Sequence, residues 1–286
     1  MTVSSPLGST TSDAGAAERT PARRPAGTGA RWAGAMARSA VGLVSLVAAY
    51  ELLRLVGVLP SASAPGVPSI GSALVSGLAD GTLTGPLGDT AQAWALGLAV
   101  ATAIGLPLGM VTGLSRWADS VTGVAVEFLR PVPAVALIPV GIVVFGLEIG
   151  LQVFLVAFAT VWPVLIGSRH GVRTVDPLLI DSARALGQSR ARVLYRVVVP
   201  ASVPAFATGL RTAAGIGVVV AVAVEIVSGS PGLGYHLNSA QQSGRVTDAF
   251  AAVLLAGLFG VVVDLAARAA ENRLAGWQRH TTEGRR

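Results

Sequence analysis

The sequence predicts an all-α polytopic membrane protein with six transmembrane helices. Three observations lead to this fold class. Of the 286 residues, 52% are hydrophobic and only 13% are charged, and the mean hydropathy is +0.66. Six segments are long and apolar enough to cross a bilayer, which takes about 20 residues in a helix. The arginines are concentrated in alternate connections between these segments.

This composition excludes several other classes of protein. A soluble domain has on average about 25% charged residues, and a disordered chain combines low hydrophobicity with high charge. The chain has no cysteine and only three scattered histidines, so we expect neither a metal site nor a cofactor. A nucleic-acid partner is not expected either, because it would require a basic patch on a soluble fold.

The expected elements follow in order along the chain. Residues 1–35 are rich in Ala, Gly, Thr, Ser, Pro and Arg without apolar periodicity, which predicts a disordered cytoplasmic tail. Residues 36–277 form the expected transmembrane domain, and residues 278–286 form a second cytoplasmic tail. Proline and glycine inside the spans are compatible with membrane helices. The six expected spans are residues 40–59, 90–114, 124–145, 150–167, 205–227 and 250–267.

The arginines also predict the orientation of the spans. With the N-terminal tail inside, nineteen of the 21 basic residues lie on the inner side, Arg245 alone lies outside, and Arg54 lies within the first span. Cytoplasmic connections of membrane proteins carry this excess of basic residues. We therefore expect both termini in the cytoplasm.

The connection between spans four and five, which we call the 169–204 loop, is the most informative stretch. Asp176 followed by a proline is typical of a helix N-terminus, and Gly187 is placed to end that helix in a left-handed turn. Ser189 can cap a second helix, which Pro200 is expected to end. These signals predict two short helices joined by a glycine turn and projecting into the cytoplasm.

Apolar residues alternate with arginines along this loop. Leu179 and Leu186 are seven positions apart and share a helix face, with Ala183 between them. One interpretation is that this face docks against another protein. The alternative is a helix pair lying at the lipid headgroups, where arginines meet acidic lipids. The pattern by itself favours neither interpretation over the other.

The same loop resembles the cytoplasmic motif of ATP-binding-cassette importer permeases. That motif has Glu-Ala-Ala, three residues, Gly, nine residues, Ile, one residue and Leu-Pro. The chain keeps every spacing and departs mildly in residue type, with Asp for Glu, Ser for Ala, and Val for both Ile and Leu. The matching residues are Asp181-Ser182-Ala183, Gly187, Val197 and Val199-Pro200.

Further stretches are similar to permeases for nitrate, sulfonate and taurine uptake, so that the resemblance covers roughly residues 43–277. It departs in the second span, where that subgroup usually has an arginine and this chain has Ala93 or a close neighbour. The similar stretches are Leu129-Arg130-Pro131-Val132-Pro133-Ala134 with Leu137-Ile138-Pro139, Val175-Asp176-Pro177, Ala223-Val224-Glu225 and Gly232-Leu233-Gly234-Tyr235.

The resemblance implies a homodimeric permease in the bacterial plasma membrane, surrounded by membrane lipid. Two copies of an ATP-binding subunit and an extracytoplasmic substrate-binding protein are the implied partners. The permease itself is not expected to be an enzyme, because it contains no Gly-x-x-x-x-Gly-Lys-[Ser/Thr] phosphate loop and no lysine. The implied ATPase-coupling residues are Leu179, Asp181, Ser182, Ala183, Leu186, Gly187 and Pro200.

Two residues are candidates for the translocation pathway. Pro133 lies in the proline-rich part of the third expected span. Glu225 is a carboxylate inside the fifth, and an ionisable residue within a membrane is a functional candidate by default. The favoured interpretation of Glu225 is nevertheless a structural hydrogen bond, to a neighbouring helix or to the backbone of an external loop, because a carboxylate would repel an anionic cargo.

The cargo stays open at this point. The subgroup resemblance suggests a small anion such as an alkanesulfonate, taurine or nitrate, whereas similar permeases carry neutral heterocyclic vitamin precursors. A secondary transporter, not driven by ATP, is the alternative from a different class. Such a transporter would show an internal repeat of its spans, and no repeat is evident in this sequence.

Overall fold

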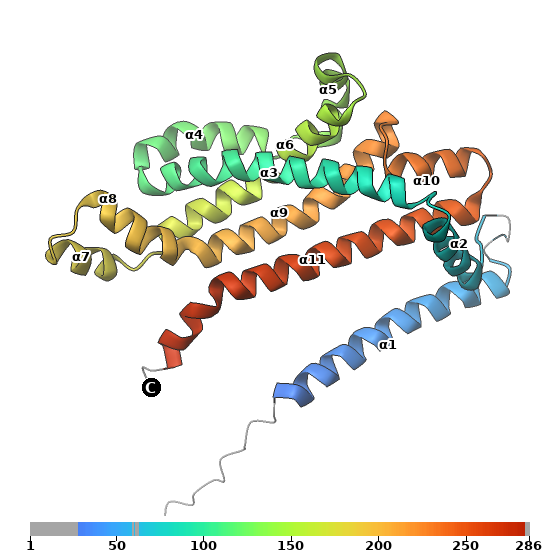
Figure 1. Cartoon of the computed structure of the whole chain (residues 1–286), viewed down its shortest axis with the longest axis horizontal. Coiled ribbons are helices and arrows are strands. Elements are labelled where there is room, and N and C mark those ends of the chain that lie inside the picture. Colours follow the sequence, from blue (N-terminus) through green and yellow to red (C-terminus); the bar gives the residue numbers. More distant parts are fainter. Residues whose placement is uncertain (1–27, 59, 61–62, 284–286) are drawn as a thin grey trace, which may run out of the picture. The chain divides into compact units, whose positions relative to one another are not determined.

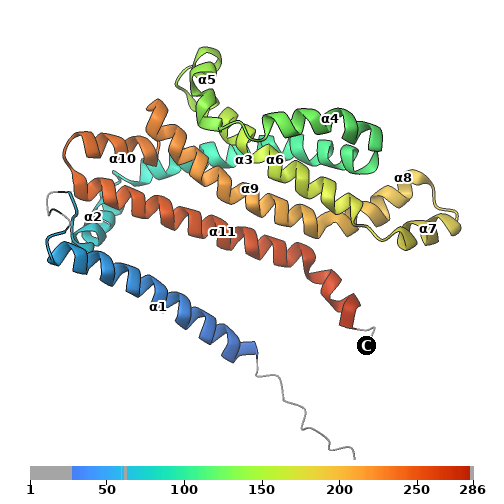
Figure 2. The same cartoon turned by 180° about the vertical axis from the view of Figure 1, so that it is seen from behind.

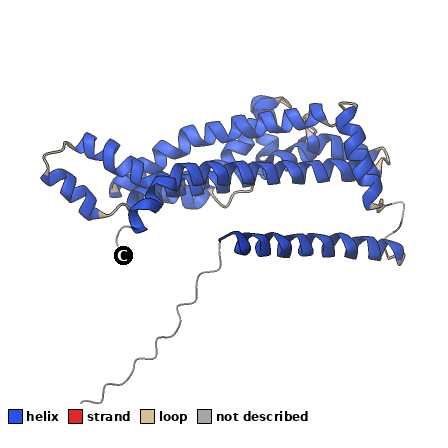
Figure 3. Ribbon diagram, turned by 60° about the horizontal axis from the view of Figure 1, so that its bottom comes forward, coloured by secondary structure: helices blue, strands red, loops and turns tan. Residues whose placement is uncertain are grey.

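A computed structural model describes residues 28–58, 60 and 63–283 of the chain. The regular structure of these residues is entirely helical, without a strand among them, which confirms the predicted all-α class (Figure 3). The chain divides into two compact units, residues 1–52 and 53–286, and each is described by itself.

The first unit contains most of helix α1, Thr28–Leu55. This helix begins at Thr28, well before residue 40, where the first span was expected to start, so it includes residues 28–35 of the expected tail. Alanine and arginine, which favour helix, are frequent at its beginning. The remainder of the expected tail, residues 1–27, lies outside the described residues.

Four long helices of the second unit run alongside one another (Figures 1 and 2). Helix α6 packs against both α3 and α9, and α9 packs against α11. They contain the second, fourth, fifth and sixth expected spans. The four helices are α3 (Thr84–Leu114), α6 (Ile149–Arg173), α9 (Val199–Ser228) and α11 (Val246–Glu283).

The third expected span, residues 124–145, is not one helix. Helix α4 (Arg116–Leu129) is followed by the 3-10 helix η1 (Ala134–Leu137) and by α5 (Ile138–Phe145), with a bend of 85° between the two parts. The prediction was wrong here because it treated the prolines as tolerable. Pro131 and Pro133 both lack the N–H group that would continue the helical hydrogen bonds, and Pro133 itself has extended backbone, so together they interrupt the helix.

The number of spans follows from these helices. Within the described residues, four helices are long and apolar enough to cross a membrane, and the bent pair would be a fifth span. The first expected span, residues 40–59, is not among them. A total of six spans therefore stays a prediction.

Two short helices that the sequence analysis did not anticipate lie at one end of the second unit. They are α2 (Val67–Ala79) and α10 (Leu233–Gln242). Helices α7 and α8 of the 169–204 loop lie at the opposite end (Figures 1 and 2). Leu83 and Leu233 are both buried in one apolar cluster with residues of α11, which fixes α10 against the long helices.

Small residues allow the long helices to approach closely. A Cβ atom on Gly105 of α3 would lie 2.9 Å from the carbonyl oxygen of Val161 on α6, and one on Gly109 would collide with the backbone of Leu165. Small residues spaced four apart are typical of helix contacts in membranes. Helices α3 and α6 therefore touch almost backbone to backbone.

Candidate functional site

The 169–204 loop begins its first helix as the sequence predicts. Helix α7 spans Pro177–Ala185, and the side chain of Asp176 accepts a hydrogen bond from the N–H of Leu178 over 2.9 Å. This bond satisfies one of the free N–H groups at the helix start. Pro177 fits the first helical position because its missing N–H would have no partner there.

The turn after α7 depends on Gly187, whose φ angle is +75°. Its N–H donates to the carbonyl of Arg184 over 2.9 Å, and the N–H of Gln188 donates to the carbonyl of Ala183 over 3.2 Å. A left-handed residue with such bonds is the common way to end a helix, and glycine adopts it without a steric penalty. The predicted glycine turn is confirmed.

The second helix of the loop differs from the prediction at its end. Ser189 caps α8 (Arg190–Val193) by accepting a bond from the N–H of Arg192. The chain then passes through a π-helical turn, Leu194–Val198, directly into α9, so Pro200 does not end the helix. Pro200 lies in the first turn of α9, where a missing N–H is tolerated, and the wide turn before it absorbs the change in helix spacing.

The interior of the loop is apolar. Ala183, expected on the docking face between Leu179 and Leu186, is only 7% exposed and lies in this interior, so that expectation was wrong. Packing of α7 against α8 and the π-helical turn after it, with Val172 of α6 in the same cluster, takes precedence over the sequence spacing. The buried cluster consists of Val172, Val175, Ala183, Val193 and Val198.

The outer surface of the loop presents leucines to solvent. Leu178, Leu179 and Leu186 are 67%, 52% and 81% exposed. Ser182 is also exposed, and Asp181 makes only a long, exposed ion pair of 3.9 Å with Arg184. Ion pairs of this kind contribute little to stability. Burial of these leucines against a partner would thus contribute more binding free energy than the exposed ion pair.

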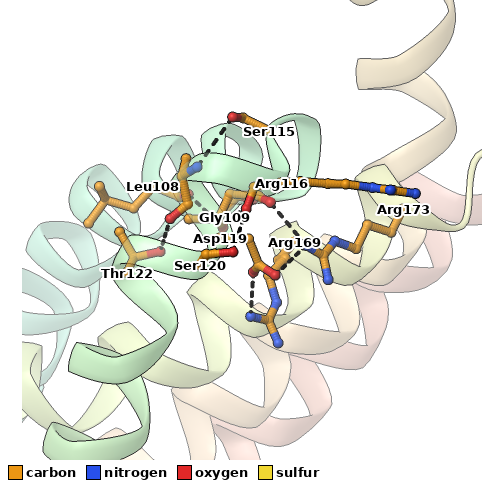
Figure 4. Close-up of polar contacts among 11 residues, drawn as sticks. Leu108, Gly109, Ser115, Arg116, Asp119, Ser120, Thr122, Arg169 and Arg173 are labelled. Atoms are coloured by element: carbon orange, nitrogen blue, oxygen red, sulfur yellow. Dashed lines mark hydrogen bonds and ion pairs between the residues drawn. The ribbon is translucent and has the colours of Figure 1, made fainter.

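The loop is fastened to the long helices by an ion-pair cluster (Figure 4). Asp119 of α4 pairs with Arg169 over 2.8 Å and with Arg173 over 2.7 Å, both on the last turns of α6. Arg173 also donates to the carbonyl of Thr112, at the end of α3, over 3.3 Å. The cluster ties three helices together where the loop begins, and the sequence analysis did not identify it.

A second charged cluster joins α9 to α11. Asp264 pairs with Arg268 over 2.6 Å, as the spacing of four residues suggests. It also pairs with Arg211 over 3.0 Å, and Arg211 in turn pairs with Glu271 over 3.4 Å. The links across the two helices could not be inferred from local spacing.

Glu225 lies at the other end of the bundle, fully buried. Its Oε2 accepts hydrogen bonds from the N–H of Gly234 over 2.8 Å and from the hydroxyl of Thr90 over 3.0 Å. Thr90 Oγ1 accepts in turn from the N–H of Leu233 over 2.9 Å. This is the structural bond to neighbouring backbone that the sequence analysis favoured, and it holds the start of α10 against α9 and α3.

Other features of the candidate residues are simpler. Pro133, the second pathway candidate, is exposed at the start of η1.

Asp80, at the end of α2, has its pKa lowered because the N–H and hydroxyl of Thr82 donate to its carboxylate. Within the part of the chain that the structure describes, no group of three His, Asp or Glu residues is placed to hold a metal ion.

With this geometry established, comparison with known proteins identifies the family. Residues 105–276 match the family described as the binding-protein-dependent transport system inner membrane component. The chain belongs to this family. It is therefore the permease subunit of a binding-protein-dependent ATP-binding-cassette importer, and a multi-pass membrane protein.

Named relatives fit this assignment. The chain is 30% identical over 234 residues to a protein of Escherichia coli named as an aliphatic sulfonates transport permease, covering 82% of this chain and 89% of the relative. It is 31% identical to the taurine transport system permease of the same organism, covering 70% and 73%. It is 34% identical to a bicarbonate transport system permease of Synechococcus elongatus, covering 59% and 62%.

A solved structure shows the same fold at low identity. The inward-facing MetNI methionine ABC transporter has a chain that superposes with a TM-score of 0.58 at 16% identity, covering 67% of this chain and 95% of the other. At this identity the likeness concerns the fold alone.

Proposed function

We propose that the chain forms a homodimer with a single translocation path and imports a small anion, such as an alkanesulfonate, taurine or nitrate. Support for the cargo comes from the relatives, two of which are named for sulfonate compounds and a third for bicarbonate. In this proposal two ATP-binding subunits act from the cytoplasm, and a substrate-binding protein delivers the anion from outside.

The observation that carries the coupling role is the construction of the 169–204 loop. Helix α7 is capped at both ends, packs through Ala183 into the buried cluster of the loop and presents exposed leucines on its outer side. A short rigid element with an apolar outer surface suits docking into a partner's cleft. Leu179, Leu186 and the Gly187 turn are therefore proposed to transmit the motion of the ATPase, and Pro200 lies where α9 begins.

The orientation belongs to the same proposal. The 169–204 loop carries six arginines between Arg169 and Arg196, and such an excess marks the cytoplasmic side. Both termini are then cytoplasmic. Pro133, at the bend after α4, is retained as a candidate for the pathway. Glu225 is instead proposed to shape the outer end of that pathway through α10.

The test is reconstitution in vesicles of the permease, the ATP-binding subunit and the binding protein. We expect uptake of radiolabelled taurine, methanesulfonate or nitrate that needs ATP and stops when either partner is left out. Uptake that persists without the ATP-binding subunit and follows an ion gradient would instead indicate a secondary transporter. ATP-dependent uptake of a neutral pyrimidine but of none of the anions would overturn the cargo class.

A further inference from the structure

Two cavities near the start of the 169–204 loop share one arginine. The first, about 450 Å³, lies between α4 and α6, and the second, about 490 Å³, lies between α6 and α9. Arg130 and Ile166 line both of them. Arg130 therefore lies between the two cavities, directly before the bend between α4 and α5.

The charge of Arg130 is not neutralised by a neighbouring acid. Within the described residues it makes no ion pair, although Glu127 lies three positions away and lines the first cavity with it. Glu127 lines only the first cavity. Arg169, which also lines the first cavity, is already paired with Asp119. Arg130 thus offers unengaged N–H donors to the second cavity.

The second cavity has a lining that suits a small anion. Its polar residues are Arg130, His170, Thr208 and Thr212, without an acidic residue among those that line it. The carboxylate of Glu271 accepts from the hydroxyl of Thr208, one of the lining residues, over 2.7 Å and pairs with Arg211. Among the residues that line the cavity, a negatively charged ligand would therefore meet one arginine and one histidine and no carboxylate.

Two glycines, Gly167 and Gly209, are among the residues that line the cavity. A Cβ atom on Gly167 would lie 2.8 Å from the Cα of Gly209, so the two helices cross in contact at this point. Neither glycine has a side chain that would fill the cavity. A volume of about 490 Å³ falls within the range of about 300–1,000 Å³ that small-molecule sites occupy.

We propose that this second cavity is a binding site for a small oxyanion, held by the guanidinium of Arg130 with His170 beside it, on the route of the cargo toward the loop side of the membrane. The inference rests on the proposed import of an anion and deepens it. The planar fork of a guanidinium matches two oxygens of a sulfonate or carbonate group and gives charge-assisted hydrogen bonds.

The test is binding of methanesulfonate to the full chain purified in detergent, followed by thermal unfolding and isothermal titration. We expect methanesulfonate to raise the melting temperature and its neutral analogue methanesulfonamide to have no effect. Arg130→Gln should weaken binding at least about tenfold, the effect of losing a charge-assisted hydrogen bond. Arg130→Lys, which keeps the charge but loses the fork, should fall between the two.

Arg116→Gln is the matched control, because Arg116 lies at the other end of α4 and lines neither cavity. This variant should bind methanesulfonate as the unaltered chain does. Equal binding by Arg130→Gln, or equal loss in Arg116→Gln, would overturn the site. Melting of each variant without ligand shows that it is folded.

A lipid headgroup carries similar chemistry, so copurified phospholipid is counted as phosphate per protein. Loss of phospholipid in Arg130→Gln with unchanged methanesulfonate binding would assign the site to lipid and overturn the proposal. The binding assay is independent of transport. If binding depends on Arg130 while vesicles take up none of the anions, the site stands and the proposed cargo is wrong. If vesicles take up an anion but methanesulfonate binding does not depend on Arg130, the proposed cargo stands and the site is wrong.

Discussion

Thr90 of α3 and Glu225 of α9 meet in the interior although 135 positions separate them, with the hydroxyl of Thr90 donating to Oε2 of Glu225 over 3.0 Å. The same carboxylate oxygen receives the N–H of Gly234. The pair thereby connects the two long helices with the first turn of α10.

Replacing Glu225 with alanine should lower the thermal stability of the chain. It leaves the N–H of Gly234 buried without its acceptor, which costs about 1–3 kcal/mol. The hydroxyl of Thr90 loses one acceptor but keeps the carbonyl of Pro86. Glu225→Gln keeps an acceptor oxygen and should lose less. The measurement is the melting temperature of both variants in detergent, and equal melting of Glu225→Ala and the unaltered chain would contradict the role given to this residue.

Gly232→Ala should be destabilising for a related reason. Gly232 has a φ angle of +149°, and a Cβ atom added there would overlap the carboxylate of Glu225. Part of the loss should disappear when Glu225 is also alanine, because the overlap is removed while the backbone strain remains. A double-mutant cycle on melting temperatures measures this coupling, and strict additivity would show that the two residues do not meet.

Docking of the ATP-binding subunit should depend on the leucines of α7. Replacing both Leu179 and Leu186 with aspartate should release the subunit from membranes, since burying one leucine contributes about 1.5–3 kcal/mol. Replacing Arg190 and Arg192 with glutamine should release it only partly. The measurement is the amount of subunit that sediments with membranes; retention in the leucine variant with loss in the arginine variant would indicate a mainly electrostatic interface.

Gly187→Val should uncouple ATP hydrolysis from uptake while the permease still inserts in the membrane. No atom lies within 4 Å of the added Cβ, so the effect would come from the left-handed backbone alone, at about 1–2 kcal/mol for a residue with a Cβ. Gly187→Asn is the matched control, because asparagine tolerates this conformation. The measurement compares ATPase activity with uptake, and normal uptake by the valine variant would refute the role of the turn.

The orientation can be tested with single cysteines, since the chain has none. We expect a cysteine at position 63 to react in intact cells with an impermeant thiol reagent and one at position 189 to react only after the cells are opened. Both Ser63 and Ser189 are exposed, so access depends on the side of the membrane. The opposite labelling would reverse the proposed topology.

Local signals predicted the 169–204 loop well. The cap at Asp176, the left-handed Gly187 and the cap at Ser189 each depend on a residue and its near neighbours, which a sequence displays directly. The bend at Pro131 and Pro133 was missed because general tolerance for proline in membrane helices was applied to two prolines in three residues. Pro200 was expected to end the second helix, but a π-helical turn before it lets the helix continue into α9.

Contacts between distant segments could not be predicted. Asp119 and Arg169 are 50 positions apart, and nothing in the spacing of either indicates the other. A structural hydrogen bond to Glu225 was expected, but its donors were not identified, because they depend on how α10 folds back. Helices α2 and α10 themselves were missed, since each is short and its apolar face becomes clear only against α11 and α3.

The backbone contact between α3 and α6 at Gly105 and Gly109 has a mechanical consequence. Helices in such close contact resist sliding along one another. A force on the 169–204 loop is therefore transmitted along α6, a helix of about 37 Å. Deformation must then concentrate where helical hydrogen bonds are interrupted, at the link between α4 and η1. Arg130 lies at that link, and we expect each movement of α6 to change the width of the space around its guanidinium.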